Sequence, residues 1–551
     1  MFLRAPGLLA IGVLTVLAGA IAPSPARATP GPDSVAVLAN ADVPGSVALA
    51  ARYASARDIP SRQVCSLSMP VTEDVALDVF RARVEAPLRA CLEAAGVRSR
   101  IEAIVVMRGA PLRVVVDVAG VARTVSLTSA LALGDTVLSA DGAPLLGRDP
   151  GQDLDCGGTA CWGAAWPSAF HAEPFHAGWT RTERGIVHRP LLVTMLHGRS
   201  DDDAARLLTA ALDAEGRPPS EEILFMDGAD PARGALDGET EAVLSGLAAR
   251  GRAARRVPFA ADQSGLRLAG FFTGTATLGA TIEGNSFAPG ALVDNLTSFG
   301  ALPENFRETG EAQVSIARWV ARGVTGVHGT VAEPLNNCFP SRRLVLEYAD
   351  GATLAEAYYG RMPFVYWQNL VLGDPVAAPY AVRPQVVIDG VADGSAVPSG
   401  RTLAVRAESP AGRPIERLAL YRDGVLLAEA EGGALEACLV GSAPGPSQLL
   451  AVATSAGDLE HWPARGWTRL TVEVGPGPDG CTAPAADAGT IDAGVDPDGA
   501  VVGLDAGGTP GPTSAGGCRI GPSTRTGTAV ARVLWTLALA LVAWRRRSTA
   551  R

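Results

Sequence analysis

The sequence predicts an α/β fold with a mostly parallel, doubly wound sheet, followed by an all-β sandwich. Between residues 34 and 380, short apolar segments alternate with segments whose apolar residues recur every three to four positions, a pattern typical of strands alternating with amphipathic helices. Between residues 383 and 474 the pattern changes to short segments of alternating polarity separated by turn residues, which is typical of antiparallel strands. With 47% hydrophobic residues, the chain can build substantial cores.

The elements of the first block are expected in a regular order. The predicted strands are 34–39, 101–107, 191–196, 222–226, 268–272 and 324–327. The predicted helices are 46–57, 77–95, 200–215, 239–252, 313–322 and 354–359. Because helices separate the strands, neighbouring strands should be parallel and covered on both faces. Functional sites in such sheets lie at the carboxyl ends of the strands.

The second block predicts an immunoglobulin-like sandwich of about ninety residues. Its predicted strands are 385–388, 402–407, 418–421, 449–453 and 470–474, and the turn Arg422-Asp423-Gly424 indicates a hairpin. The unit Leu420–Leu426 resembles the strand-turn-strand of bacterial Ig-like modules on secreted enzymes and adhesins. The module is therefore expected to act either as a spacer or as a carbohydrate contact.

Both ends of the chain predict export. Arg4, the apolar stretch 8–22 and the small-residue site Ala26-Arg27-Ala28 are typical of a signal peptide spanning residues 1–28. Residues 475–517 are rich in Gly, Pro, Ala and Asp, so they predict a flexible acidic stalk that cannot bury enough apolar surface to fold.

Residues 518–551 form the most distinctive segment of the sequence. Gly516-Gly517-Cys518 is followed by a polar spacer, an apolar run at 533–544 and Arg545-Arg546-Arg547. This arrangement resembles the MYXO-CTERM sorting tail of myxobacterial surface proteins. The resemblance implies that a sorting protease processes the tail at Cys518, which becomes the end anchored to the cell envelope. The alternative is an uncleaved membrane helix, and either form leaves an exported protein anchored at the cell surface or outer envelope.

Composition excludes several classes of function. All 47 basic residues are Arg, so the chain has no P-loop lysine, Schiff-base lysine or Ser-Lys dyad. The formal net charge of −10 argues against nucleic acid as a partner. The sequence predicts no cofactor and no metal site.

The eight cysteines of an exported chain predict disulfides. The candidate pairs are Cys65–Cys91, Cys156–Cys161 and Cys438–Cys481. Because Cys518 belongs to the tail, Cys338 is left as the odd cysteine. A metal site at the C-x4-C pair is not favoured, since neither His nor a second Cys pair follows at zinc-finger spacing.

Five phrases in the first block resemble a family of exported bacterial proteins of unassigned function, over most of residues 34–380. They are Tyr53 with Arg57–Pro60, Met107–Leu112, Phe287–Gly300, Gly326–Pro334 and Trp367–Pro375. The order and spacing of the five phrases together make this resemblance specific.

The phrase Leu372–Pro375 is also similar to the end of the catalytic domain in gingipain-type cysteine peptidases. That resemblance implies a caspase-like α/β head. In those enzymes a Gly-His-Gly after one strand supplies the base, and a Cys after the next strand supplies the thiolate. Here the comparable strand is followed by Thr273-Gly274 without a His, and residues 288–298 contain no Cys. The resemblance therefore does not carry peptidase activity to this chain.

Another pair of residues offers the same chemistry. His328 and Cys338 stand ten residues apart beyond a predicted strand, and a thiol needs a neighbouring base or cation to form a useful thiolate at neutral pH. Ser298 is a second candidate nucleophile, although no Gly-x-Ser-x-Gly elbow surrounds it. The residues Asp294, Asn295, Glu333 and Asp374 are candidates for ligand binding or acid-base chemistry, and turn formation is the competing interpretation.

An aromatic insertion at 162–179 is expected either to cap the sheet or to stack on a sugar ring. His171 and His176 in this insertion have a spacing that could bind a metal, but the many Trp and Pro residues around them favour a packed surface insertion. The leading hypothesis is a surface-tethered protein whose head binds without catalysis. The alternatives are a peptidase-like hydrolase that uses His328 and Cys338, or Ser298, and a carbohydrate-binding surface protein.

Overall fold

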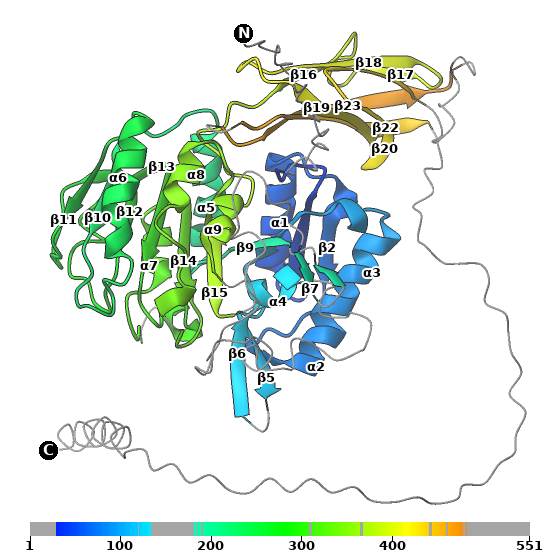
Figure 1. Ribbon diagram of the computed structural model, residues 1–551. Helices are drawn as coiled ribbons and strands as arrows, with labels where there is room; N and C mark the ends of the chain where they lie inside the picture. The colour runs from blue at the N-terminus through cyan, green and yellow to red at the C-terminus, as the bar shows by residue number, and fades with distance from the viewer. Residues whose placement is uncertain are drawn as a thin grey trace, which may run out of the picture. The chain divides into compact units, whose positions relative to one another are not determined.

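The computed structural model describes residues 29–118, 121–133, 181–183, 186–188, 191–307, 311–334, 336–363, 367–439, 444–458, 461–477 and 481. Within them, helices cover a large sheet, and several smaller, mostly antiparallel sheets accompany it (Figure 1). We refer to residues 34–380 as the head and to residues 385–475 as the β module. Both belong to one compact unit.

The head is built on a ten-stranded sheet. Its order is β11 (Ala254–Val257), β10 (Glu222–Met226), β12 (Arg267–Thr273), β13 (Ser286–Asn295), β14 (Gly326–Thr330), β15 (Asn369–Gly373), β9 (Leu192–Leu196), β4 (Ala103–Met107), β1 (Val35–Asn40) and β2 (Val64–Leu67). Neighbouring strands are parallel from β11 to β14 and again from β9 to β2, whereas β15 is antiparallel to β14. The predicted mostly parallel sheet is confirmed.

Most of the described helices match predicted ones with small shifts at their ends, but Leu127–Leu133 and Leu344–Ala349 were not predicted. The helices are α1 (Pro44–Ala56), α2 (Leu77–Phe80), α3 (Ala86–Ala94), α4 (Leu127–Leu133), α5 (Asp201–Ala214), α6 (Thr240–Ala249), α7 (Ile316–Ala321), α8 (Leu344–Ala349) and α9 (Leu354–Arg361). The predicted helix 77–95 is a continuous run in which a π-helical turn, Arg81–Glu85, joins α2 to α3.

Side-chain caps fix where two of these helices begin. The Ser200 hydroxyl accepts from the Asp203 amide at the start of α5, and three aspartates in the first turn complement the helix dipole. Thr353 and Glu356 form a capping box at the start of α9. These caps hold α5 directly after β9, and α9 against the centre of the sheet.

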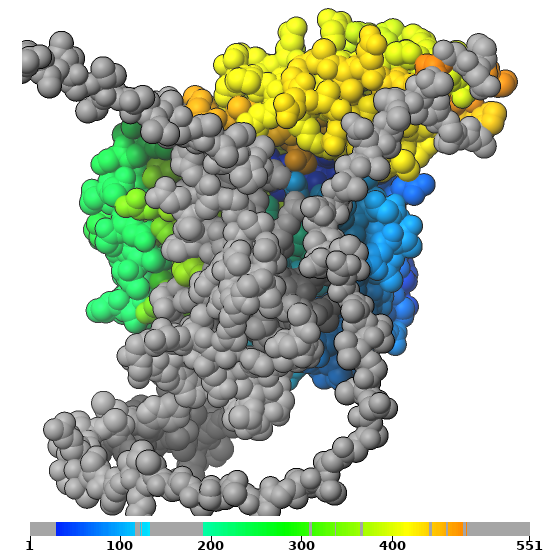
Figure 2. Space-filling model, turned by 45° about the vertical axis from the view of Figure 1, so that its right-hand side comes forward, coloured from blue at the N-terminus to red at the C-terminus, as the bar shows by residue number. Residues whose placement is uncertain are grey.

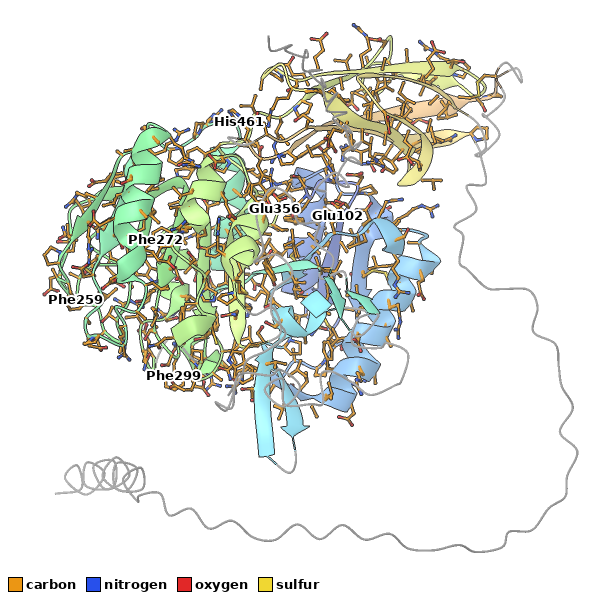
Figure 3. The ribbon with its side chains drawn as sticks, viewed as in Figure 1. Glu102, Phe259, Phe272, Phe299, Glu356 and His461 are labelled. Atoms are coloured by element: carbon orange, nitrogen blue, oxygen red, sulfur yellow. A yellow bond between two sulfur atoms is a disulfide. The ribbon has the colours of Figure 1, made fainter. Side chains whose placement is uncertain are left out.

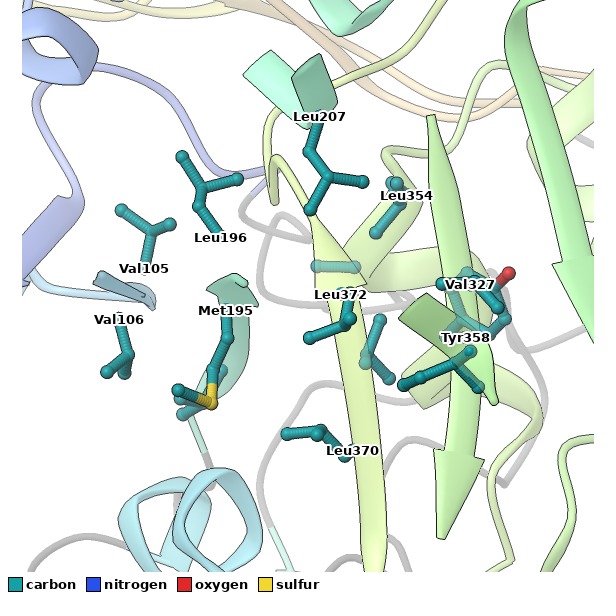
Figure 4. Packing of buried hydrophobic residues seen from close by; sticks show 14 of the residues in the cluster. Val105, Val106, Met195, Leu196, Leu207, Val327, Leu354, Tyr358, Leu370 and Leu372 are labelled. Atoms are coloured by element: carbon teal, nitrogen blue, oxygen red, sulfur yellow. The ribbon is translucent and has the colours of Figure 1, made fainter. Parts of the chain in front are cut away.

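One hydrophobic core runs through the whole head. Its central part joins residues of β4 and β9, such as Val105 and Met195, to Leu372 of β15 and Val327 of β14 (Figure 4). This continuity shows that the two parallel groups of strands form a single body.

The sequence did not predict four strands of the main sheet, β2, β11, β13 and β15, or two small additions to the head. A small sheet joins β3 (Asp74–Ala76), β5 (Arg113–Val118) and β6 (Val121–Ser126), and a separate pair joins β7 (Arg181–Glu183) to β8 (Ile186–His188). None of the described helices is long and apolar enough to cross a bilayer, and the apolar run 533–544 lies outside the described residues.

The β module consists of two sheets that share one core. The first contains β16 (Gln385–Ile388), β18 (Thr402–Glu408) and β21 (Ala434–Cys438), and the second contains β17 (Ala396–Pro398), β23 (Ala464–Gly475), β22 (Gly445–Ser455), β19 (Ile415–Arg422) and β20 (Val425–Ala430). Leu403 and Val405 from the first sheet pack with Leu418 and Leu449 from the second. All five predicted strands are present, together with three short ones that the pattern missed.

The predicted hairpin turn between β19 and β20 is confirmed. Asp423 and Gly424 both have positive φ, 49° and 76°, as the favoured two-residue hairpin turn requires. Cys65 forms a disulfide with Cys91, and Cys438 forms one with Cys481, whereas Cys338 is buried and is not in a disulfide. Cys156, Cys161 and Cys518 lie outside the described residues.

The β module packs directly on the head rather than hanging from a free linker (Figure 2). Asp33, just before β1, forms ion pairs with Arg465 at 3.1 Å and Arg417 at 3.2 Å, and accepts a hydrogen bond from Tyr421 at 2.9 Å. The indole of Trp467 donates to Asp58 at 3.0 Å. These buried and half-buried contacts fix the module to the amino-terminal end of the head.

Candidate functional site

The centre of the sheet contains a buried histidine held by two neighbouring strands. His328 lies on β14, where strand pairing sets it beside Asp294 of β13. Its Nδ1 lies 2.8 Å from Asp294 Oδ1, and its Nε2 lies 3.0 Å from Asn369 Oδ1 on β15. The imidazole is 0% exposed. Both ring nitrogens therefore already have oxygen partners.

Aromatic side chains enclose this histidine. Phe339 packs edge-on against the His328 ring with centroids 5.4 Å apart, and Tyr358 of α9 lies 6.4 Å away. The Tyr358 hydroxyl donates to the Val293 carbonyl at 2.9 Å, and burial raises the pKa of Tyr358 well above its usual value. The ring is thus held in a dry, rigid environment.

Cys338 lies in the turn Asn336–Cys338, directly before Phe339, and is also 0% exposed. The structure therefore buries both members of the predicted dyad, His328 and Cys338, completely. Nucleophilic cysteines lie in partly exposed, electropositive surroundings, whereas buried structural cysteines are inert.

Two other predicted residues meet at the carboxyl ends of β13 and β14. The hydroxyl of Ser298, which is half-buried, donates to Oε1 of the exposed Glu333 at 2.7 Å. The Thr330 hydroxyl donates to the Ser298 carbonyl at 2.9 Å and holds this segment in place. A carboxylate in this position polarises the serine hydroxyl and is placed to accept its proton.

Asn295 has a structural place at the same edge of the sheet. Its side-chain oxygen accepts from the Thr275 amide at 2.9 Å, and its side-chain nitrogen donates to the Thr275 carbonyl at 3.1 Å. Asn295 therefore ties the end of β13 to the segment after β12. Both of its polar groups bond backbone rather than an open cleft.

Asp374 directly follows β15, whose carboxyl end lies beside the start of β14. Its side chain is 0% exposed. It accepts from the Tyr53 hydroxyl at 2.8 Å and from Arg57, which also pairs with Glu215 at 2.8 Å. Burial lowers the pKa of Arg57, but Asp374 and Glu215 outweigh it and raise that pKa above its usual value. Asp374 is thus a buried anchor for the end of α1, apart from Ser298 and Glu333.

The sequence did not single out His197, which directly follows β9. Its ring packs edge-on against Phe306 with centroids 4.5 Å apart. Its Nδ1 is buried without a hydrogen-bond partner. Burial, aided by the charge of Arg108, lowers the pKa of His197 to about 3, so the ring is neutral at physiological pH. The sequence feature that could have pointed to His197 is a His-Gly pair immediately after the predicted strand 191–196.

Together these features define an α/β protein with a large, mostly parallel sheet and an attached two-sheet β module. No protein-family model matches the chain, and no curated protein sequence matches it significantly. Among solved structures, the fibronectin(III)-like modules of Clostridium thermocellum CbhA are similar over 16% of this chain and 94% of that chain, at 20% identity and a TM-score of 0.14. The endo-β-1,4-mannanase from Thermotoga petrophila is similar over 22% of this chain and only 24% of that enzyme, at 7% identity and a TM-score of 0.14.

Proposed function

We propose that this is an exported protein, tethered to the cell envelope by its C-terminal tail, whose caspase-like head binds a partner without cleaving it. The observation that carries the non-catalytic assignment is the complete burial of His328 and Cys338, with both ring nitrogens of His328 bonded to Asp294 and Asn369. A peptide bond has no access to a pair of side chains that are both 0% exposed. The histidine instead cross-links β13, β14 and β15.

The β module is proposed to be an immunoglobulin-like sandwich that orients the head relative to the envelope. Its ion pairs with Asp33 support this role, because a module fixed to the head transmits the direction of the stalk. The carbohydrate-binding alternative depends on the aromatic insertion 162–179, which lies outside the described residues, so it stays a prediction.

The contact between Ser298 and Glu333 favours a second candidate function. A serine that donates to a carboxylate at 2.7 Å, at the carboxyl ends of two strands, has the position expected of a nucleophile in an α/β fold. This candidate is a hydrolase of ester or peptide bonds, with Ser298 as the nucleophile and Glu333 as its base.

Labelling of the purified full-length protein separates these functions. Iodoacetamide is expected to leave Cys338 unmodified in the native protein and to modify it after unfolding, because the thiol is fully buried. A fluorophosphonate is expected to label neither the native protein nor the matched surface variant Ser245→Ala. If the fluorophosphonate labels the native protein, and both Ser298→Ala and Glu333→Gln abolish that labelling, the protein is a hydrolase and the binding assignment is wrong. Native labelling lost only in Cys338→Ala would establish the thiol enzyme.

The tether predicts a separate result. If Cys518 is the processing site, Cys518→Ala is expected to stop removal of the tail and to release or mislocalise the protein, as measured by mass spectrometry and fractionation of the cell envelope. Cys338→Ala serves as the matched control, because its cysteine lies inside the head. Unchanged processing and retention in Cys518→Ala would show that the tail is only a membrane helix.

A further inference from the structure

A cavity of about 520 Å³ lies where the β module meets the head. The head side contributes Glu102, which is labelled in Figure 3, and the β module contributes Glu416, Glu431, Thr454 and Arg465. A volume of this size lies within the range of small-molecule sites. Such sites also occur preferentially where two domains meet.

The charges in the cavity wall are not balanced. Five carboxylates face three guanidinium groups, a formal excess of two negative charges. Arg417 pairs with Asp33 and Glu429, and Arg465 pairs with Asp33 and Glu102, at distances of 3.0–3.3 Å. Together with Arg100, these two arginines balance the charges of Asp33, Glu102 and Glu429.

Two of the carboxylates that line the cavity, Glu416 and Glu431, are left over. Among the described residues, neither Glu416 nor Glu431 forms an ion pair. Burial raises the pKa of Glu416 above its usual value, as expected for a carboxylate that loses water without gaining a cation. These two carboxylates are therefore complementary to a positive charge.

Two residues that line the cavity each carry a polar atom without a hydrogen-bond partner. Arg465 and Thr454 are each 4% exposed, yet Arg465 Nε and Thr454 Oγ1 make no hydrogen bond. Leaving such buried groups unpaired destabilises the folded protein. Both atoms can donate, so an oxygen acceptor within the cavity would satisfy them.

We propose that this cavity binds a small organic cation that also carries a hydrogen-bond-accepting oxygen. The ammonium or guanidinium group faces Glu416 and Glu431, and the oxygen accepts from Arg465 Nε and Thr454 Oγ1. Two sources share this chemistry, a basic amino-acid residue and an amino sugar. The inference extends the proposed binding role by naming a ligand class, and its failure would leave the labelling and tethering results untouched.

Calorimetric titration of the full-length protein tests this site, with L-argininamide and glucosamine as separate probes. Saturable binding of either cation is expected, and the tighter probe identifies the source. Glu416→Gln is expected to weaken that binding about tenfold, the equivalent of about 1.4 kcal/mol. Thr454→Val, which keeps the side-chain shape, should weaken it about fivefold, as expected for one hydrogen bond.

The matched control is Glu436→Gln, on the exposed face of β21, which should leave the affinity unchanged. Glucose, which lacks the positive charge, should not bind. If neither cation binds at about millimolar concentration, the cavity is a solvent-filled gap and the proposal is overturned. Binding that survives both Glu416→Gln and Thr454→Val would place the ligand elsewhere and overturn it equally.

Discussion

Arg465→Met is expected to lower the free energy of unfolding by about 3 kcal/mol, because removing one partner of a buried ion pair strands the opposite charge. Arg465 is 4% exposed, and its Nη1 contacts Asp33 at 3.1 Å, Glu102 at 3.3 Å and the Ser34 hydroxyl at 2.8 Å. The variant leaves two carboxylates in this joint with one guanidinium fewer. Urea unfolding followed by circular dichroism measures the loss.

The joint between head and module should weaken in the same variant. Limited proteolysis is expected to cut the connection at residues 381–384 faster than in the wild type, since Arg465 lies on β23 and Asp33 lies before β1. A second substitution, Asp33→Asn, should recover part of the lost stability by removing the stranded charge.

An exposed ion pair provides the control. Arg406 and Asp389 pair on the β module with side chains 63% and 33% exposed, and such pairs contribute about 0–1 kcal/mol. Arg406→Met should therefore change stability little. If Arg465→Met were no more destabilising than Arg406→Met, the joint would not depend on this buried network.

The regular elements of the head were predictable because their signals are local. The strand 222–226 was predicted with the bounds of β10, since a short apolar run lies between turn residues and a helical pattern. In contrast, β13 was missed as a strand because Pro289 and Gly290 interrupt its pattern. There the backbone takes a positive φ of 93° at Gly290, and the pairing with β12 shifts register.

The contacts that decide the candidate sites could not be predicted, because they depend on strand order. His328 contacts both Asp294 and Asn369 because β14 lies between β13 and β15 in the sheet. The sequence marked His328 and Asp294 as chemically interesting but gave no indication that they bond each other within the core. The pair of Asp33 with Arg465 joins positions 432 residues apart, which no local pattern encodes.

His197, which the sequence did not single out, is expected to make the stability of the folded protein depend strongly on pH. Its pKa is about 3 in the folded protein, against 6.5 for an unperturbed histidine. Between these values the unfolded chain binds a proton that the folded chain does not, so stability is complete above pH 6.5 and falls as pH decreases toward 3. The slope approaches about 1.4 kcal/mol per pH unit, which is a loss of about 2 kcal/mol at pH 5.

Equilibrium unfolding at several pH values between 5 and 7 isolates this effect, because carboxyl groups with ordinary or lowered pKa change little in that window. His197→Leu keeps an apolar contact with Phe306 and removes the titrating ring, so its stability is expected to be nearly constant across the window. His461→Leu, at an exposed position, should retain the full slope. A wild-type protein as stable at pH 5 as at pH 7 would mean that His197 accepts a proton in the folded state, and that the end of β9 is open to water.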